Sequence, residues 1–167
     1  MLLQMPQQSL IIQTRAGNAI ANEASPKMMP QEIEQQMRFQ QGKFPEGNQL
    51  FKRKNATGFY NCHALTFLSR RAWMGEEKAV ALVLKDDNYF NVSPSDVLPG
   101  DVILYHYDNG EVEHSGVVVS SPKAENEIVP MPWILSKWGH GGEFIHRYNY
   151  CPYTWRNVRY MREGQHD

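Results

Sequence analysis

The stretch Gly58-Phe59-Tyr60-Asn61-Cys62-His63-Ala64-Leu65-Thr66-Phe67-Leu68 decides how the rest of the chain is interpreted. Gly58 permits a sharp turn, because glycine tolerates positive φ. Asn61 is a preferred helix N-cap residue, and Tyr60 and Leu65 have the spacing of a hydrophobic staple. The stretch therefore predicts a turn that runs directly into a helix beginning at Cys62.

This position makes Cys62 a candidate nucleophile. The first backbone N–H groups of a helix are unpaired, and the helix dipole is positive there. Such a place stabilises a thiolate, which is the reactive form of cysteine. A buried structural cysteine is the alternative, since free cysteine is among the most buried residue types.

Composition places the chain in a broad class. Its 167 residues, 41% hydrophobic and 21% charged, fit one soluble globular domain with a core of its own. The net charge of −1 gives no basic field for nucleic acid. No apolar run approaches the roughly 20 residues of a membrane helix. The N-terminus lacks the basic and apolar regions of a Sec signal, so we expect either a cytoplasmic place or export by another route.

The first part of the chain predicts helices. Residues 1–29, rich in Gln, Asn, Ala and Met, predict a loosely ordered N-terminal arm, with a short helical piece around residues 10–21 as an alternative. The domain proper then spans residues 30–167. Pro30 suits the first position of a helix over residues 31–41. We expect the Cys62 helix to reach about Trp73, whereas residues 77–84 fit either a helix or a buried strand.

From Pro99 onward the pattern changes to β-strands. Asp108-Asn109-Gly110 is a hairpin turn between two segments rich in β-formers. The strands expected are residues 102–107, 112–119, 134–138, 144–150 and 156–161. Helices followed by an antiparallel sheet of about five strands indicate an α+β fold.

A nucleophilic cysteine needs a base, and His114 is our candidate. A base takes the thiol proton and later protonates the leaving group. His114 lies on a predicted strand, where alternation puts Gly116 and Val118 on its face. We expect the small Gly116 to leave room for the helix end that carries Cys62. A histidine satisfied inside a sheet is the alternative.

Three motifs in order resemble a known family. They are Tyr-Asn-Cys-His-Ala-Leu-Thr-Phe at 60–67, Pro-Gly-Asp-Val-Ile-Leu-Tyr at 99–105 and His-Ser-Gly-Val-Val-Val at 114–119. Together they look like the papain-like NlpC superfamily of cysteine peptidases and amidases, and the related CHAP amidohydrolases. The resemblance covers roughly residues 58–150. It implies a cysteine that opens a helix packed on an antiparallel sheet, and a catalytic histidine that opens a strand.

The resemblance also implies a third, polar residue on the following strand that orients the imidazole. Ser136 is our first choice, because a hydroxyl can accept from an imidazole N–H, and His140 is the next. Lys137 and His146 fall in the same region, but a charged lysine cannot accept a hydrogen bond. For the oxyanion hole and substrate contacts we expect the Cys62 N–H together with four side chains, Tyr60, Asn61, His63 and Trp138. The better-known members have Asp-Cys-Ser-Gly where this chain has Asn61-Cys62-His63-Ala64.

The implied activity is amide hydrolysis, of peptide or isopeptide bonds, through a thioester and without a cofactor. A peptide or peptidoglycan-like substrate is expected. A deamidase or acyltransferase effector or toxin, and an inactive papain-like binding domain, are alternatives.

Two further readings fit the sequence less well. Metal-dependent hydrolysis would use several of His106, His114, His140, His146, Cys62 and Cys151, but the chain has no HExxH and no paired CxxC. A permuted lipid acyltransferase of the lecithin:retinol type would have its histidine before its cysteine. The sequence predicts no oligomeric state.

Overall fold

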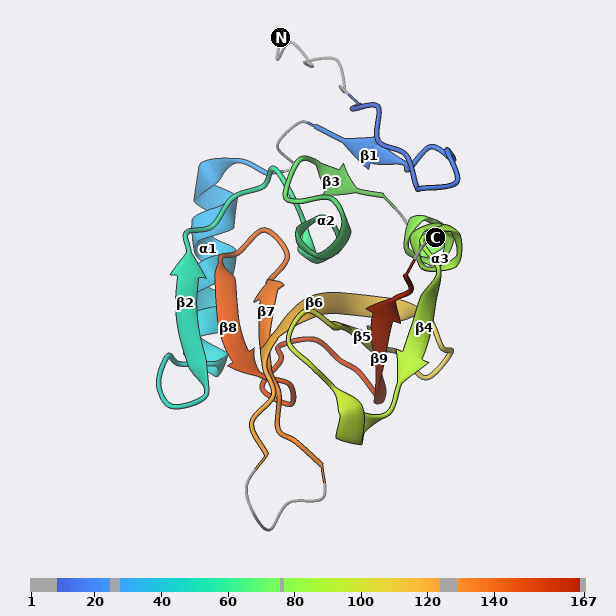
Figure 1. Cartoon of the computed structure of the whole chain (residues 1–167). Helices are drawn as coiled ribbons and strands as arrows, with labels where there is room; N and C mark the ends of the chain where they lie inside the picture. The colour runs from blue at the N-terminus through green and yellow to red at the C-terminus, as the bar shows by residue number, and fades with distance from the viewer. Residues whose placement is uncertain (1–8, 25–27, 76, 124–128, 166–167) are drawn as a thin grey trace, which may run out of the picture.

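A computed structural model describes residues 9–24, 28–75, 77–123 and 129–165. Its main element is an antiparallel sheet of seven strands in the order β2-β8-β7-β6-β5-β9-β4 (Figure 1). These strands are β2 (Leu50–Lys54), β4 (Tyr89–Val92), β5 (Val102–His106), β6 (Val112–Ser120), β7 (Trp133–Lys137), β8 (Glu143–Arg147) and β9 (Asn157–Glu163). The helices are α1 (Pro30–Lys43), α2 (Cys62–Phe67) and α3 (Glu77–Asp86), with a short 3-10 helix, η1 (Pro94–Asp96).

The α+β class is confirmed, but the expected number of strands is too small. All five expected strands are present as β5 to β9, and β2 and β4 extend the sheet at its two edges. In β2 only Leu50 is buried, and the basic run that follows it is exposed. Neither edge strand carries the regular alternation that marks a half-buried strand. Pairing with a distant neighbour decides their conformation.

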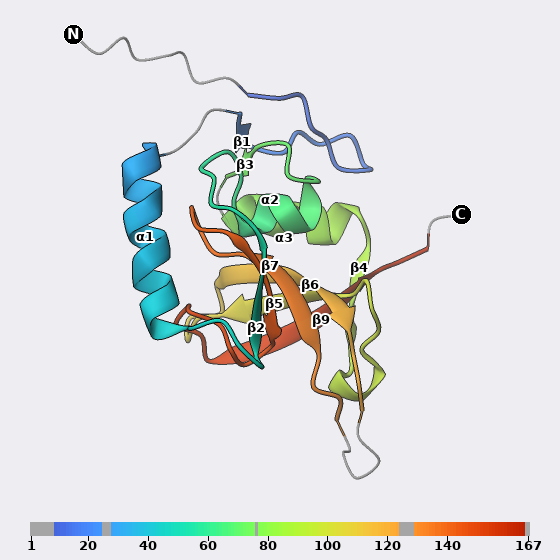
Figure 2. The ribbon, with the colours of Figure 1, turned by 90° about the vertical axis from the view of Figure 1, so that its left-hand side faces the viewer.

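The central strands present different side chains to two cores, because successive residues point to opposite faces. On one face Leu104, Val117 and Leu135 pack against residues of α2 and α3. On the other face Ile103, Val118 and Ile134 pack with Cys151 from the connection between β8 and β9. Figure 2 shows α2 and α3 lying together over one side of the sheet. Helix α2 is thereby held against β6 and β7.

Helix α2 is shorter than expected. Its last residue is Phe67, and Ser69 and Arg70 follow with φ of 51° and 66°. This left-handed turn redirects the chain into β3 (Trp73–Met74), so the predicted extension to Trp73 is wrong. Residues 77–84, which fitted two structures, form most of α3.

The described part of the N-terminal arm belongs to the core. Residues 9–24 contain no helix, so the alternative helical piece around 10–21 is wrong. Ile12 and Ile20 are buried in the cluster that includes α2 and α3, and Thr14 Oγ1 donates to Asp86 Oδ2 at 2.7 Å. Strand β1 (Asn22–Glu23) pairs with β3. These residues are therefore packed rather than loosely ordered, while residues 1–8 and 25–27 of the arm lie outside the described residues.

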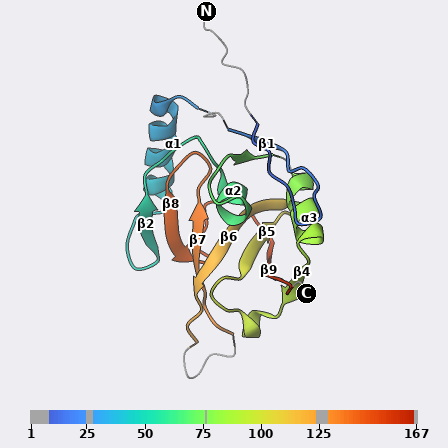
Figure 3. The same cartoon turned by 45° about the horizontal axis from the view of Figure 1, so that its top comes forward.

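Helix α1 packs at the other end of the sheet. Figure 3 shows α1 beside β2 and β8. Met37 of α1 joins Leu50, Trp138 and Phe144 in a separate apolar cluster. None of the helices in the described ranges is long and apolar enough to cross a membrane.

Candidate active site

The N-terminus of α2 is fixed by Asn61, as the sequence predicts. Asn61 Oδ1 accepts from the Ala64 N–H at 3.0 Å and from the Met74 N–H at 3.2 Å, and its Nδ2 donates to the Met74 carbonyl at 2.9 Å. The side chain thus caps the helix and ties it to β3. Both polar atoms of Asn61 are therefore engaged in hydrogen bonds inside the protein. Cys62 is the first residue of α2, and 6% of its surface is exposed.

His114 lies beside Cys62 in a closed environment. It pairs with Tyr105 of β5, none of its surface is exposed, and the Tyr153 ring stacks on it with 4.2 Å between centroids. Burial lowers the pKa of His114, and the nearby Cys62 thiol opposes that shift. The imidazole is therefore held in its neutral form next to the thiol.

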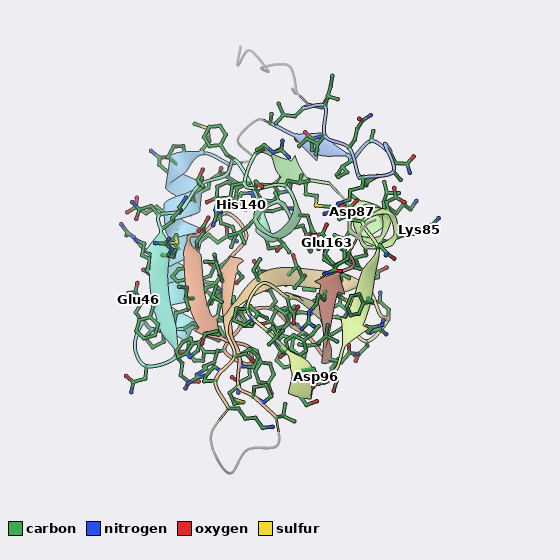
Figure 4. The ribbon with its side chains drawn as sticks, viewed as in Figure 1. Glu46, Lys85, Asp87, Asp96, His140 and Glu163 are labelled. Atoms are coloured by element: carbon green, nitrogen blue, oxygen red, sulfur yellow. The ribbon has the colours of Figure 1, made fainter. Side chains whose placement is uncertain are left out.

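Apart from the Cys62 thiol, neither ring nitrogen of His114 has a hydrogen-bond partner among the residues that the structure describes. The thiol acts on the ring by its charge and by a hydrogen bond, and both raise the pKa of His114. Ser136 Oγ pairs with His146 Nε2 at 2.7 Å instead, so this arrangement does not give Ser136 the orienting contact that the sequence suggested. His140, labelled in Figure 4, stacks on Trp73 in the turn after β7, with 4.4 Å between ring centroids.

Gly116 does not make the room that we expected of it. A Cβ atom there would lie 2.5 Å from Ile134 Cγ2 and 2.9 Å from the Leu135 carbonyl oxygen, so the small residue accommodates β7 rather than the helix. The contact with α2 comes from Ser115, whose Oγ lies 2.8 Å from His63 Nδ1 and 3.0 Å from Thr66 Oγ1.

The residues expected to touch a substrate are buried in structural contacts. His63 is held by Ser115, and burial lowers its pKa to about 4. The Tyr60 hydroxyl donates to Glu143 Oε1 at 2.6 Å. Trp138 is fully buried and packs edge-on against Phe44. A substrate role for these side chains stays a prediction, and it would require them to be uncovered.

Two buried charges were not anticipated. Lys137 is fully buried, and its Nζ donates to the carbonyls of Thr57 and Gly139 at 2.8 and 2.6 Å. Glu143 is also fully buried, and its Oε1 accepts from Arg70 Nε at 2.5 Å. One signal was available in the sequence. Alternation along β7 puts Lys137 on the face of Leu135, which is an inward position where a lysine is unusual.

An open groove lies beside α1, and neither Cys62 nor His114 is among its lining residues. It has a cavity volume of about 760 Å³ and lies between α1 and the segment that precedes Cys62. Met29, Ile33 and Met37 form its wall on the α1 side, and Thr57 and Phe59 form the opposite wall. The groove is mostly apolar, with Arg38 and Lys52 among its polar lining.

In the described ranges, His, Cys, Asp and Glu residues nowhere gather in groups of three or more that could hold a metal ion. His106 Nδ1 lies 2.9 Å from the Gly110 carbonyl oxygen, and both nitrogens of His146 have partners. Comparison with known proteins gave no match to any family model, curated protein or solved structure.

Proposed function

We propose that this chain is a cysteine-dependent amide hydrolase with a papain-like fold, in which Cys62 is the nucleophile and His114 the general base. One observation carries the proposal. A cysteine at the first position of a capped helix lies beside a neutral histidine whose nitrogens have no partner in the described residues other than that thiol. A base must be free to accept a proton and to return it, and a neutral imidazole with no competing partner meets that need.

The reaction follows from these two groups. His114 accepts the proton of the Cys62 thiol, and the sulfur attacks the amide carbonyl carbon as the C=O π pair moves to oxygen. The tetrahedral intermediate collapses, the C–N bond breaks, and the amine leaves with the proton from His114. Water then attacks the thioester and restores the thiol. The Cys62 N–H, at the positive end of α2, suits the oxyanion.

The substrate class is the peptide or isopeptide bond, including the cross-linked peptides of cell walls. An amine that replaced water in the second step would make the same site an acyltransferase, and ammonia as the leaving group would make it a deamidase. The apolar groove beside the segment that precedes Cys62 is the open surface that we assign to the substrate.

A second candidate function is that of an inactive papain-like binding domain. The burial of the candidate base favours this function, because His114 is fully buried and the Tyr153 ring stacks on it. In the active reading, substrate binding must displace the Tyr153 ring.

The experiment that separates the two functions is an acyl-enzyme trap. The protein is mixed with a p-nitrophenyl ester of an N-acyl amino acid, and p-nitrophenol release is followed together with intact mass. We expect a burst of one equivalent and an adduct on Cys62 that hydroxylamine removes. Cys151→Ser should behave as the wild type and Cys62→Ser should lose both signals. An adduct-free protein, or a burst that persists in Cys62→Ser, would overturn the proposal.

A further inference from the structure

We propose that Lys137 is a positioning residue of this site, whose fixed ammonium group stabilises the thiolate of Cys62 in the absence of a side chain that orients His114. The inference rests on the proposed function, and it gives a buried lysine a task separate from that of the predicted third residue: it stabilises the thiolate, whereas the third residue would orient the imidazole.

The ammonium is held in place by the backbone. Lys137 Nζ donates to the carbonyl of Thr57, in the segment that leads to Cys62, and to the carbonyl of Gly139, in the turn after β7. An ammonium has three N–H donors, so these two bonds fix its position and leave one donor. A lysine fixed by two backbone carbonyls carries its charge at a defined point, as an electrostatic role requires.

That point lies at the Cys62 end of α2. Lys137 shares a strand face with Leu135, and that face packs against α2. The ammonium also lies 5.2 Å from the ring centroid of Tyr60, which stands two residues before Cys62. Three independent contacts, to Thr57, Tyr60 and Gly139, therefore hold this one cation near the helix end.

The other charged groups near Lys137 leave its positive charge available to stabilise the Cys62 thiolate. The titratable groups that act on it are Cys62 from α2 and Glu143 from β8. Glu143 already accepts hydrogen bonds from Arg70 and from Tyr60, so its charge is compensated. Burial lowers the pKa of Lys137 to about 8, and Cys62 and Glu143 both oppose the shift. A buried ammonium is unfavourable without an anion, and the Cys62 thiolate supplies one.

In the reaction Lys137 keeps all of its protons. The thiol proton still passes to His114 and then to the leaving amine, while the ammonium stabilises the sulfur anion before attack and again when the thioester breaks. A neighbouring lysine is one of the recognised ways to favour a cysteine thiolate.

The test compares two alkylating reagents on Cys62, with rates read at each cysteine by mass spectrometry. Iodoacetate is anionic and iodoacetamide is neutral, so the ratio of their rate constants reports local positive charge. We expect this ratio to fall about tenfold in Lys137→Met, because a unit charge is removed from a partly desolvated site. The control Lys85→Met removes an exposed charge from the last turn of α3 and should leave the ratio unchanged.

The outcomes separate this inference from the proposed function. An unchanged ratio in Lys137→Met, with Cys62 still dependent on His114, would overturn the role of Lys137 alone. A Cys62 that reacts no faster than the buried Cys151 in the wild type would overturn the proposed function itself.

If Lys137→Met does not fold, the wild type provides the test. The protein is labelled with ¹³Cε-lysine, and the Lys137 resonance is titrated before and after Cys62 is capped with a neutral methylthio group. Loss of the thiolate should lower the pKa of Lys137, and an unchanged titration would overturn the inference.

Discussion

Two buried histidines on the same sheet, His146 and His114, have opposite surroundings. Both are fully buried. In His146 one nitrogen lies 2.7 Å from Ser136 Oγ and the other 2.8 Å from the Arg147 carbonyl oxygen. In His114 neither nitrogen has a partner in the described part of the chain other than the Cys62 thiol. A satisfied buried histidine stabilises the fold, whereas an unsatisfied one lowers stability and is available for chemistry.

The largest effect that we expect comes from acid, which acts on the satisfied histidines. Burial lowers the pKa of His63 and His146 from 6.5 to about 4. The unfolded chain therefore binds protons at a higher pH than the folded chain, and stability is lost as the pH falls from 6.5 toward 4. At pH 5 each histidine should lower the free energy of unfolding by about 2 kcal/mol, or about 4 kcal/mol together.

Urea unfolding at pH 7 and pH 5 measures this loss. His63→Asn should reduce the difference between the two pH values by about 2 kcal/mol, the share of one histidine, while His146 and His114, whose pKa burial also lowers, still contribute. Equal stability at both pH values would contradict the neutral, buried state that we assign to these rings.

Removal of the satisfied histidine should come next in size. His146→Ala leaves a cavity and an unpaired Ser136 hydroxyl, so we expect a loss of about 3 kcal/mol in the free energy of unfolding. The rate of Cys62 alkylation in the folded protein should stay within twofold of the wild type. A large fall in that rate, at unchanged fold, would assign His146 to the active site and end the contrast.

Ser136→Ala tests the orienting residue that the sequence suggested. Loss of its hydroxyl leaves His146 Nε2 unpaired and should lower the free energy of unfolding by about 2 kcal/mol. Because Ser136 pairs with His146 and not with His114, alkylation of Cys62 should not change. Slower alkylation, measured alongside chemical denaturation, would show that Ser136 contacts His114 in the working enzyme.

The smallest effect has the opposite sign. His114→Phe replaces an unsatisfied polar ring by an apolar one in a pocket already lined by Tyr105 and Tyr153. We expect the free energy of unfolding to rise by about 1 kcal/mol while Cys62 becomes less reactive. If His114→Phe unfolds as readily as His146→Ala, the His114 nitrogens are satisfied in solution and the contrast fails.

The sequence predicts those parts of the molecule that depend on neighbouring residues. The Asn61 cap, the helix start at Cys62 and the strands from β5 to β9 all follow from local patterns. The missed parts depend on distant pairing. β2 shows a single buried residue and acquires its conformation by pairing with β8. The short α2 results from the turn at Ser69 and Arg70, which brings the following residues to β1.

The candidate site shows the same division between features set by neighbouring residues and features set by distant pairing. Motif order places Cys62 and His114 in the candidate site without any knowledge of the sheet. The partner of Ser136 is decided by the register between β7 and β8, and the environment of Lys137 by the loop at Thr57. A stacking residue such as Tyr153, in an irregular connection, carries no pattern that could have indicated it. Prediction from sequence therefore named two residues that are neighbours in the structure, Cys62 and His114, but not the groups that surround them.

The most direct measurement of the central claim is the rate at which iodoacetamide alkylates Cys62 at pH 7 in the wild type and in His114→Ala. We expect Cys62 to react faster than Cys151, whose buried thiol has a raised pKa, and His114→Ala to slow Cys62 by about tenfold or more. If the rate at Cys62 is the same with and without His114, in a variant shown by circular dichroism to be folded, His114 is not the base for Cys62.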